Sequence, residues 1–434
     1  MVVADPPPPL ADPSPAATGN AAATGNAAVT GDAAAEPAAA SGVGPRGRTA
    51  PRSSSARPFR LLHVYSGNLY GGVERLLETL HAQEARGGER GDRKRTAGEP
   101  AGGLRQDFAL CFEGRLSERL RAAGGRVFDL GPVRRRAPWT GLRARRRLAE
   151  HLRTAAAEER PYDALLFHSF WPLAMFGAVS RRTPRLLWVH DDPDSAHWTF
   201  RRAMARGADG VIFNSEFVRD RPASRLLTKG LGVAQNRDRL VRYPVPAPPA
   251  TAPERRAAVR QELGVGDADA LLLIAARFEP WKGHELLLEA LGRLRDVPGW
   301  TCAIAGDAQR RVERSRMAAL KTRAARLGVA DRLRWLGHRD DVPALMSAAD
   351  VYCQPNVGPE PFGIVFVEAL YAGCPVVTTA IGGGREILKP TGAAGRTPVG
   401  GVLTGIDAAA VATALRSLIR DPGRRRGLGA GGPA

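Results

Sequence analysis

The sequence predicts an α/β protein with two domains, each a parallel β-sheet wound with helices. Short, mainly apolar runs alternate with segments of helical periodicity along most of the chain, which is the pattern of strands buried between helices. The length of 434 residues exceeds one typical domain. A Pro-rich segment near the middle separates the two alternating regions. Since ligands of such sheets bind at the carboxyl ends of the strands, we expect the functional residues there.

The chain begins with a low-complexity segment, residues 1–57. It consists mostly of Ala, Pro, Gly, Ser and Thr, with TGN at 18–20, TGN at 24–26 and TGD at 30–32. Three copies of a short unit are too few to build a solenoid, and this composition forms no core. We predict a disordered tail. Upstream sequence from a misplaced start codon is the alternative.

The first domain is predicted to span residues 58–243. Phe59–Tyr65 has the composition of a buried strand, Ser66–Gly72 that of a Gly-rich turn, and Val73–Ala85 the periodicity of an amphipathic helix. This arrangement binds anions in nucleotide folds, although the two glycines also suit a plain tight turn. We expect a polar surface loop at 87–105. Further strands are expected at Phe108–Phe112, Arg126–Leu130, Ala164–Phe167, Leu186–His190 and Gly210–Phe213.

The second domain is predicted at residues 254–434. It follows a Pro-rich linker, 244–253, which is expected to be extended and hinge-like. Strands and helices alternate again beyond the linker. The expected strands are Ala270–Ala275, Cys302–Ala305, Leu333–Leu336, Val351–Cys353 and Val402–Leu403, and the expected helices are Gly283–Arg295, an Arg-rich helix ending at Leu327, Gly363–Ala372 and Ala408–Leu418.

The stretch Pro359–Val377, PEPFGIVFVEALYAGCPVV, carries the clearest chemistry. Its predicted helix, Gly363–Ala372, is apolar on nearly every face and should be buried, so Glu368 needs a hydrogen-bond donor. The helix entry offers free N–H groups and the positive end of the helix dipole, which bind anions. A phosphate there, flanked by two carboxylates that accept hydrogen bonds from hydroxyls, describes a nucleotide-sugar. Glu360 would hold the sugar ring and Glu368 the ribose.

This stretch resembles a known family. Two Glu residues separated by seven others, in the setting EPFG…EALYAG, are followed by a GG..E element formed by Gly382, Gly383 and Glu386. The whole run resembles the donor site of retaining GT-B glycosyltransferases of family 4, the glycosyl transferases group 1. The resemblance covers about residues 59 to 428. It implies two doubly wound, Rossmann-like domains that face a cleft, with the acceptor on the first domain and the donor on the second.

The resemblance also implies the activity and a set of site residues. The activity would be transfer of a sugar from a nucleoside-diphosphate sugar to an acceptor hydroxyl, with retention at the anomeric carbon. The residues that would contact the donor are Gly71, Gly72, Arg277, Lys282, Glu360, Phe362, Gly363, Ile364, Val365 and Glu368.

Two cations and one histidine complete the predicted catalytic group with Glu360. Arg277 and Lys282 lie five residues apart at a strand-to-helix turn, where they can close on a diphosphate, and they match the family's R…KG element. His190 ends a predicted strand, where the family places a His that contacts the donor sugar. For His168, at another strand end, a structural role is favoured. No residue stands out as a base, which agrees with a leaving phosphate that takes the acceptor proton.

Asn214 and Ser215 follow a further predicted strand, where the serine is expected to cap the next helix. Asp192 and Asp194 form a DxD pattern, a metal-binding motif of another glycosyltransferase fold. The same pattern recurs elsewhere in the chain, and the predicted donor residues already account for phosphate and sugar. We therefore expect no metal and no other cofactor.

The strongly positive net charge is compatible with other partners and other classes of protein. A net charge of +19 favours acidic partners. Trp139–Arg153 would be a basic amphipathic helix, whose leucines either face the core, which we favour, or contact an anionic membrane surface. Nucleic-acid binding is a rival class, but the arginines are dispersed and aromatic residues make up only 6% of the chain, so we expect none. A nucleotide-sugar epimerase or a non-catalytic binding module would suit the same architecture.

Four scattered cysteines, without metal-binding spacing, indicate a reducing compartment, so a cytoplasmic location is expected. Peripheral contact with the inner face of the membrane is a further expectation. No motif identifies the acceptor, the transferred sugar or the nucleotide base of the donor. Relatives usually continue past the helix ending near Arg420 with a helix that crosses back to the first domain, so we expect the second domain to be truncated at Ala434.

Overall fold

A computed structural model describes residues 57–67, 71–89, 103–134, 136–179, 182–231, 237–306, 308, 310–388 and 400–432. Residues 55–434 form one compact unit. The predicted tail lies outside the described residues except for Arg57. That residue is held by a two-pronged ion pair to Asp163, with N–O distances of 2.5 and 3.0 Å.

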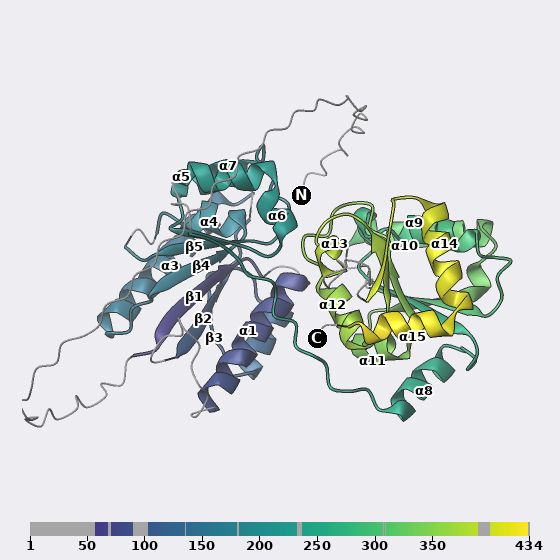
Figure 1. The fold of residues 1–434 in the computed structure, drawn as a ribbon. Coiled ribbons are helices and arrows are strands. Elements are labelled where there is room, and N and C mark those ends of the chain that lie inside the picture. Colours follow the sequence, from purple (N-terminus) through teal and green to yellow (C-terminus); the bar gives the residue numbers. More distant parts are fainter. Residues whose placement is uncertain are drawn as a thin grey trace, which may run out of the picture. The chain divides into compact units, whose positions relative to one another are not determined.

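The first domain is built on a seven-stranded, all-parallel sheet, as the alternation of apolar runs predicts (Figure 1). Its order is doubly wound, because the chain runs outward from β1 on one side and then from β4 on the other. Across the sheet lie β3 (Arg126–Asp129), β2 (Leu104–Leu110), β1 (Phe59–Tyr65), β4 (Ala164–His168), β5 (Arg185–Val189), β6 (Gly210–Phe213) and β7 (Asp238–Leu240). The last strand was not predicted, since three residues with two charges carry no strand pattern.

Helices cover both faces of this sheet. One face packs on α3 (Pro138–Ala157), α4 (Phe170–Phe176), α5 (Trp198–Arg206), α6 (Glu216–Asp220) and α7 (Pro222–Gly230), in a core that includes Leu148, Phe167 and Phe213. The other packs on α1 (Gly72–Glu89) and α2 (Arg115–Ala122). The loop predicted at 87–105 is shorter than expected, because α1 continues to Glu89 and β2 begins at Leu104; residues 90–102 lie outside the described part.

The second domain has a six-stranded, all-parallel sheet with the same kind of order. Its strands are β10 (Leu333–Gly337), β9 (Trp300–Ala305), β8 (Ala270–Ala275), β11 (Val351–Gln354), β12 (Val376–Thr379) and β13 (Gly401–Thr404). The chain between the two sheets has neither helix nor strand from 241 to 252, and this segment is called the linker below.

Helices also cover both faces of the second sheet (Figure 1). One core includes α9 (His284–Gly292), α10 (Arg311–Arg326) and α14 (Ala408–Arg420), and the other includes α8 (Pro253–Glu262), α11 (Val342–Ala348) and α12 (Ile364–Tyr371). Three shorter elements are α13 (Gly384–Ile387) and the 3-10 turns η1 (Pro280–Lys282) and η2 (Ala330–Arg332).

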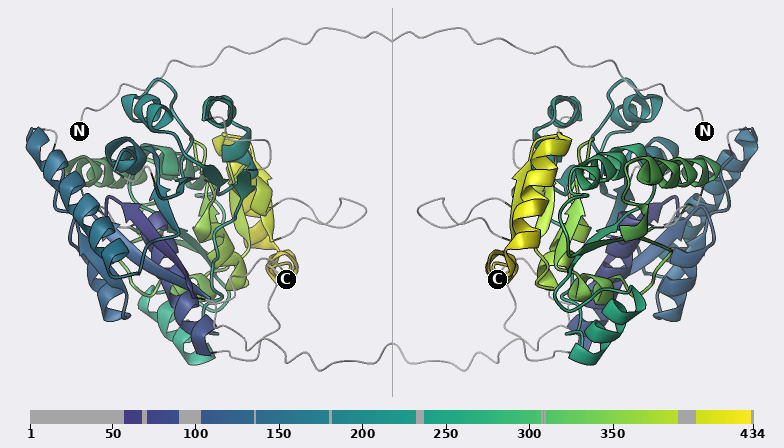
Figure 2. Two further views of the ribbon diagram at one scale, coloured as in Figure 1. Left: turned by 90° about the vertical axis from the view of Figure 1, so that its left-hand side faces the viewer. Right: turned by 90° about the vertical axis from the view of Figure 1, so that its right-hand side faces the viewer.

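A helix that was not predicted, α15 (Pro422–Ala430), follows α14 (Figure 2). Asp421 caps it, and Leu428 is buried in the same core as α14. Gly429 packs so closely on the carbonyl of Gly373 that a Cβ would lie 2.1 Å from its oxygen. This helix therefore packs on the second domain itself.

The basic helix α3 buries less of its apolar side than expected. Leu148 is fully buried and Leu152 packs against the core, but Leu142 is 49% exposed and Trp139 66% exposed. The expectation that all its leucines face one side was wrong for Leu142, because Gly141 and Ala144 supply the contact at that turn. Their small side chains let the helix lie close to its neighbours.

Candidate functional site

A cavity of about 550 Å³ lies at the carboxyl ends of β1, β5, β8, β9 and β11. Residues of both sheets line it. Every residue that the sequence assigned to catalysis or donor binding is among them: Gly71, Gly72, His190, Arg277, Lys282, Glu360, Phe362, Gly363, Ile364, Val365 and Glu368. Neighbouring strands of a parallel sheet end at one edge, so residues distant in sequence meet there.

Glycines shape the loop that carries Glu360. Gly383 donates its N–H to the Glu360 carbonyl at 2.7 Å, and a Cβ on Gly382 would lie 2.3 Å from that oxygen. Directly after Lys282 in the chain, a Cβ on Gly283 would lie 1.8 Å from the Pro355 oxygen. Only glycine permits such close backbone contact, and both Gly382 and Gly283 also have positive φ. The GG part of the GG..E element therefore holds the Glu360 loop in place.

Glu360 forms an ion pair with Lys282 at 2.6 Å in this structure. The side chains are only 12% and 15% exposed, so water weakens their attraction less than at an open surface. Lys282 also lies over the Trp281 ring, 3.8 Å from its centroid. The predicted sugar binder and the predicted phosphate binder thus neutralise each other.

Arg277 lines the cavity, and its two terminal guanidinium nitrogens differ in their partners. One guanidinium nitrogen, Nη2, pairs with Glu279 at 2.9 Å. The other, Nη1, is buried and has no partner among the described residues, and the same holds for Oε2 of Glu279. A buried donor without an acceptor is costly, so an anion bound here would be stabilised.

Glu368 is buried in α12, as predicted, and its partner is a side chain that the sequence did not indicate. Arg75 on α1 binds its carboxylate at 2.6 Å. Burial raises the pKa of Glu368 above its ordinary value, and the positive charge of Arg75 opposes that shift. The predicted ribose binder is therefore paired with the first domain.

Two helix N-termini meet at the cavity. The helix α12 begins at Ile364, after Gly363 with φ +98°, and a Cβ on Gly72 at the start of α1 would lie 3.6 Å from Ile364 Cδ1. The Gly71 N–H donates to the buried Glu74 carboxylate at 2.9 Å. This carboxylate also accepts the Tyr65 hydroxyl at 2.7 Å. Burial raises the pKa of Glu74.

His190 is buried, and both of its ring nitrogens are bonded within the protein. Nε2 lies 2.9 Å from His168 Nδ1, and Nδ1 contacts the hydroxyl of Tyr243 in the linker. Burial lowers the pKa of His190 to about 3, so the ring is neutral at pH 7. Its backbone carbonyl accepts a hydrogen bond from Asn214 at 2.8 Å.

Asp191 is a cavity residue that sequence reasoning missed. It lines the main cavity and also a neighbouring one of about 160 Å³, which includes Ser169, Phe170 and Thr199. Burial raises the pKa of Asp191, and the negative charges of Glu360 and Glu279 raise it further. Its position after the strand that ends near His190 was the available signal.

The DxD pattern does not converge on one point. Asp192 pairs with Arg221 at 2.8 Å, and Asp194 accepts the Ala196 N–H at 2.9 Å. Within the described ranges, no group of three or more His, Cys, Asp or Glu side chains is placed to hold a metal ion. Ser215 caps α6 by accepting the Val218 N–H, as expected.

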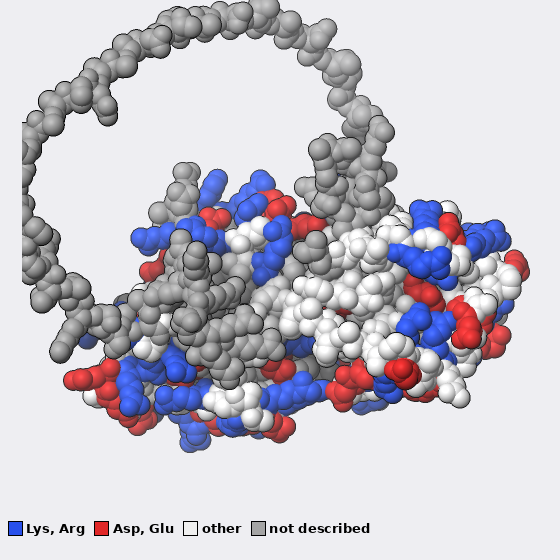
Figure 3. Space-filling view, turned by 60° about the horizontal axis from the view of Figure 1, so that its bottom comes forward, with Lys and Arg blue, Asp and Glu red and all other residues white. Residues whose placement is uncertain are grey.

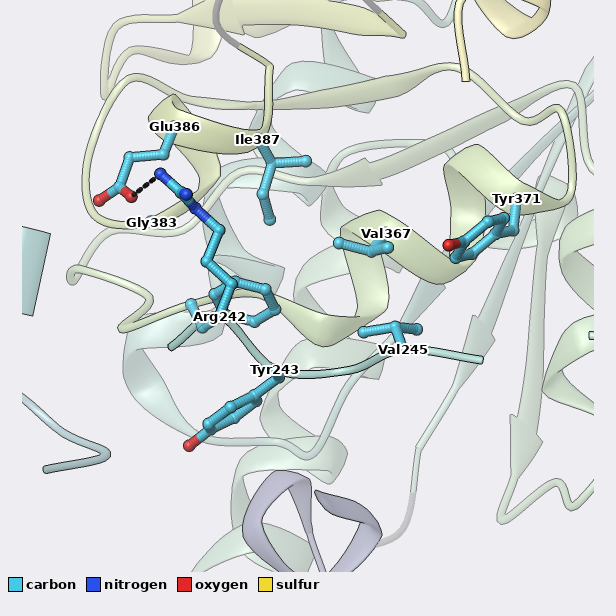
Figure 4. Close-up of a pocket in the computed structure, with 9 residues that line it drawn as sticks. Arg242, Tyr243, Val245, Val367, Tyr371, Gly383, Glu386 and Ile387 are labelled. Carbon is cyan, nitrogen blue, oxygen red and sulfur yellow. Dashed lines mark ion pairs between the residues drawn. The ribbon is translucent and has the colours of Figure 1, made fainter. Parts of the chain in front are cut away.

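Glu386, the last residue of the GG..E element, contacts the first domain. Its carboxylate accepts the N–H groups of Glu216 and Phe217 at 3.0 and 2.5 Å, at the start of α6. Arg242 in the linker approaches the same carboxylate at 3.7 Å (Figure 4). The element thus links the Glu360 loop, the linker and the first domain.

Basic residues are distributed over the surface. On the face in Figure 3, Lys and Arg side chains are interspersed with Asp and Glu. Many arginines are in ion pairs, among them Arg121 with Glu113 and Arg339 with Glu262. No helix in the described part of the chain is both long and apolar enough to cross a membrane. All four cysteines are buried and free.

The two Rossmann-like parallel-sheet domains and the cavity at their strand ends define the GT-B architecture of glycosyltransferases, and solved structures agree. The Anabaena protein HepE, solved in complex with UDP, matches with a TM-score of 0.68 and 24% identity over 86% of this chain and 93% of that one. A glycosyltransferase from Rickettsia africae matches with a TM-score of 0.67 and 18% identity, over 86% and 92%.

Sequence comparison adds further similarities. Residues 255–433 match the family model of Glycosyl transferases group 1. A GDP-mannose-dependent alpha-(1-6)-phosphatidylinositol monomannoside mannosyltransferase of Mycolicibacterium smegmatis is 29% identical over 63% of this chain and 72% of its own length. A D-inositol 3-phosphate glycosyltransferase of Geodermatophilus obscurus is 37% identical, over 41% of this chain and 39% of the relative.

Proposed function

We propose that this protein transfers a sugar from a nucleoside-diphosphate sugar to an acceptor hydroxyl, with retention of the anomeric configuration. The observation that carries the proposal is the gathering of all predicted donor residues, from both domains, around a single cavity of about 550 Å³. Retention rests on the resemblance of the Glu360–Glu368 stretch to family 4.

The donor diphosphate would lie between Arg277, Lys282 and the N-terminus of α12. Arg277 Nη1 has no partner within the described residues, and Lys282 is bound to Glu360. A diphosphate carries more negative charge than one carboxylate, so it would draw Lys282 away from Glu360. The released carboxylate then accepts hydrogen bonds from the sugar hydroxyls. In the transition state, the two cations stabilise the charge that builds on the leaving phosphate.

Glu368 would bind the ribose by an analogous exchange. Its ion pair with Arg75 joins α12 to α1, and the Arg75 side chain is 47% exposed. An exposed arginine can swing into solvent at little cost. The ribose hydroxyls would then donate to Glu368 in a site that is already shaped.

The acceptor would enter next to Asp191. This carboxylate opens onto both the main cavity and the smaller neighbouring cavity. It can accept a hydrogen bond from another hydroxyl of the acceptor and so orient the reacting one. As the oxygen of the reacting hydroxyl bonds to the anomeric carbon, its proton passes to the leaving phosphate. No cofactor is required in this scheme.

Peripheral contact with an anionic membrane surface extends the proposal. The first matched relative acts on a phosphatidylinositol mannoside by name. On α3, the exposed Trp139 and Leu142 lie among arginines, a combination suited to the interface of a lipid layer. The enzyme would then work at the inner face of a membrane, in the reducing compartment that four free cysteines favour.

A thermal-shift comparison tests the donor. GDP-mannose and UDP-glucose are the first probes, because relatives and solved neighbours carry these nucleotides in their names. We expect one of them to raise the melting temperature, since ligands that bind the native state stabilise it. Mass spectrometry then identifies the product. A transferase releases nucleoside diphosphate only when an acceptor is present, whereas an epimerase or a binding module releases none. If neither probe binds while nucleic acid does, the proposal fails.

A further inference from the structure

Five buried polar side chains form a continuous hydrogen-bonded row through the first domain. The row begins at Gln106 on β2, continues through His63 on β1, His168 on β4 and His190 after β5, and ends at Tyr243 in the linker. Each side chain is at most 8% exposed. The row crosses four adjacent strands of the sheet. We call it the histidine row, because three of its five members are histidines.

The direction of every hydrogen bond in the row is set by Gln106, at the end of the row away from the cavity. Gln106 donates from Nε2 to the Leu80 carbonyl at 2.9 Å, and a carbonyl only accepts. The amide oxygen of Gln106 therefore faces His63 Nε2, at 3.0 Å, and must accept from it. A neutral imidazole has one N–H and one acceptor nitrogen, so His63 Nδ1 is an acceptor.

The same logic passes along the row. His63 Nδ1 accepts from His168 Nε2–H at 2.8 Å, and His168 Nδ1 accepts from His190 Nε2–H at 2.9 Å. The lone pair of His190 Nδ1 then accepts the Tyr243 hydroxyl. Asn214 agrees with this order, because its Nδ2 donates to the Tyr243 oxygen at 3.3 Å.

The three imidazoles are neutral. Burial lowers the pKa of His63 to about 4 and that of His190 to about 3, and it lowers the pKa of His168 well below its ordinary value. The ring planes of His63 and His168 differ by 19° and those of His168 and His190 by 2°, with centroids 5.1 Å apart in both pairs. The rings are therefore nearly coplanar and meet edge to edge, as their N–H···N hydrogen bonds need.

The row ends where the cavity begins. His190 and Tyr243 both line the main cavity, and the Tyr243 ring packs on Phe362 of the donor loop, with centroids 5.1 Å apart. In the linker, Arg242 and Tyr243 point to opposite sides, and Val245 lies beside Val367 and Tyr371 of α12 (Figure 4). The row therefore connects the interior of the first sheet with the donor side of the site.

We infer that Gln106, His63 and His168 are positioning residues, which set the tautomer of His190 from a distance and so present an acceptor lone pair to the cavity. A lone pair there accepts only from a donor group. In this structure the donor is the phenol of Tyr243, and a sugar hydroxyl has the same chemistry. A phosphate or carboxylate oxygen cannot replace it. The kinetic consequence rests on the proposed function, whereas the tautomer does not.

Nitrogen-15 NMR of the full chain with labelled histidine, without ligand, tests the tautomer. Signals are assigned with single His→Gln variants. In the wild type we expect His63, His168 and His190 each to carry the proton on Nε2. Gln106→Leu removes the acceptor that sets the direction, and His190 should then show a mixture of tautomers. Phe108→Leu is the matched control, because Phe108 is buried and stacks on His63 at 4.9 Å without hydrogen-bonding to it.

Kinetics with the identified donor give the second readout. Gln106→Leu should lower kcat/KM for the donor about tenfold and leave KM for the acceptor within about twofold, whereas Phe108→Leu should change neither by more than about threefold. An unchanged single tautomer at His190 in Gln106→Leu overturns the inference, and so does an equal loss in both variants. A mixed tautomer with unchanged kinetics overturns the positioning role. Lack of transfer by the wild type refutes the proposed function, and the NMR result still decides the tautomer.

Discussion

Replacing Lys282 by Met tests the proposed role of its charge. Met keeps most of the length and apolar surface of the lysine stem but removes the cation that pairs with Glu360 at 2.6 Å. Lys229→Met, at the exposed end of α7, is the matched control, because it removes the same charge outside both cavities.

The magnitude follows from the charge that Lys282 would meet. Two unit charges about 4 Å apart attract by about 4 kcal/mol at an effective dielectric constant of about 20, a value suited to a partly buried pair. Only the negative charge that develops between bound donor and transition state affects turnover. If about a third of a unit charge develops, the loss is about 1.4 kcal/mol, or about tenfold in kcat.

Steady-state kinetics with the identified donor measure this loss, and a double variant separates two causes. Removing Lys282 also leaves Glu360 unpaired, and its charge could repel the diphosphate. Glu360→Gln by itself should also cost about tenfold, so the double variant is compared with that single variant. If repulsion alone were responsible, Lys282→Met would cost nothing in the Glu360→Gln background. We expect the double variant to be about tenfold slower than Glu360→Gln. Wild-type turnover in Lys282→Met would refute the assignment of Lys282 to the leaving group.

Three further predictions concern binding, pH and metal, and one concerns the membrane. Glu368→Gln should raise the donor Kd about tenfold with a smaller change in kcat, because a ribose contact is made in both the ground state and the transition state. An unchanged Kd by calorimetry would contradict the assignment of Glu368 to the ribose. The free energy of unfolding should fall as pH drops from about 6.5 to about 5.5. Burial lowers the folded-state pKa of His63 to about 4 and that of His190 to about 3, so both stay neutral in the folded protein while the unfolded chain binds protons. Each histidine contributes up to about 1.4 kcal/mol per pH unit, and a flat profile from chemical denaturation would refute this. EDTA should leave turnover unchanged, and loss that magnesium or manganese restores would show metal dependence. Trp139→Ser with Leu142→Ser should reduce co-sedimentation with anionic vesicles at least about threefold, and equal binding would exclude α3 as the contact.

The fold followed from the sequence because its main signal is local. Buried parallel strands appear as short apolar runs, and most predicted runs became strands at nearly the expected positions. The prediction failed where the local signal was weak. The strand β7 has three residues, two of them charged, and α15 contains three glycines. Both elements are held by packing against structure that is distant in sequence.

The site was predicted as a set of residues but not as a set of contacts. Glu360, Glu368, Arg277 and Lys282 were recognisable from their neighbours in the chain, and all line the cavity. Nothing near Glu368 in sequence indicates Arg75, which lies 293 positions earlier on another domain. Asp191 was passed over beside His190, because its position after a strand indicates the edge of the sheet but not the groups that it faces.

The sequence alone predicted most of the strands, the turns that need glycine and the residues of the Pro359–Val377 stretch that line the cavity, because each depends on residues within a few positions of one another. Only the tertiary structure decided which charges pair and which tautomer His190 holds. The Glu360–Lys282 pair and the histidine row join residues that are brought together by strand order. Their hydrogen bonds have direction and short range, so their partners can be known only once the backbone is placed.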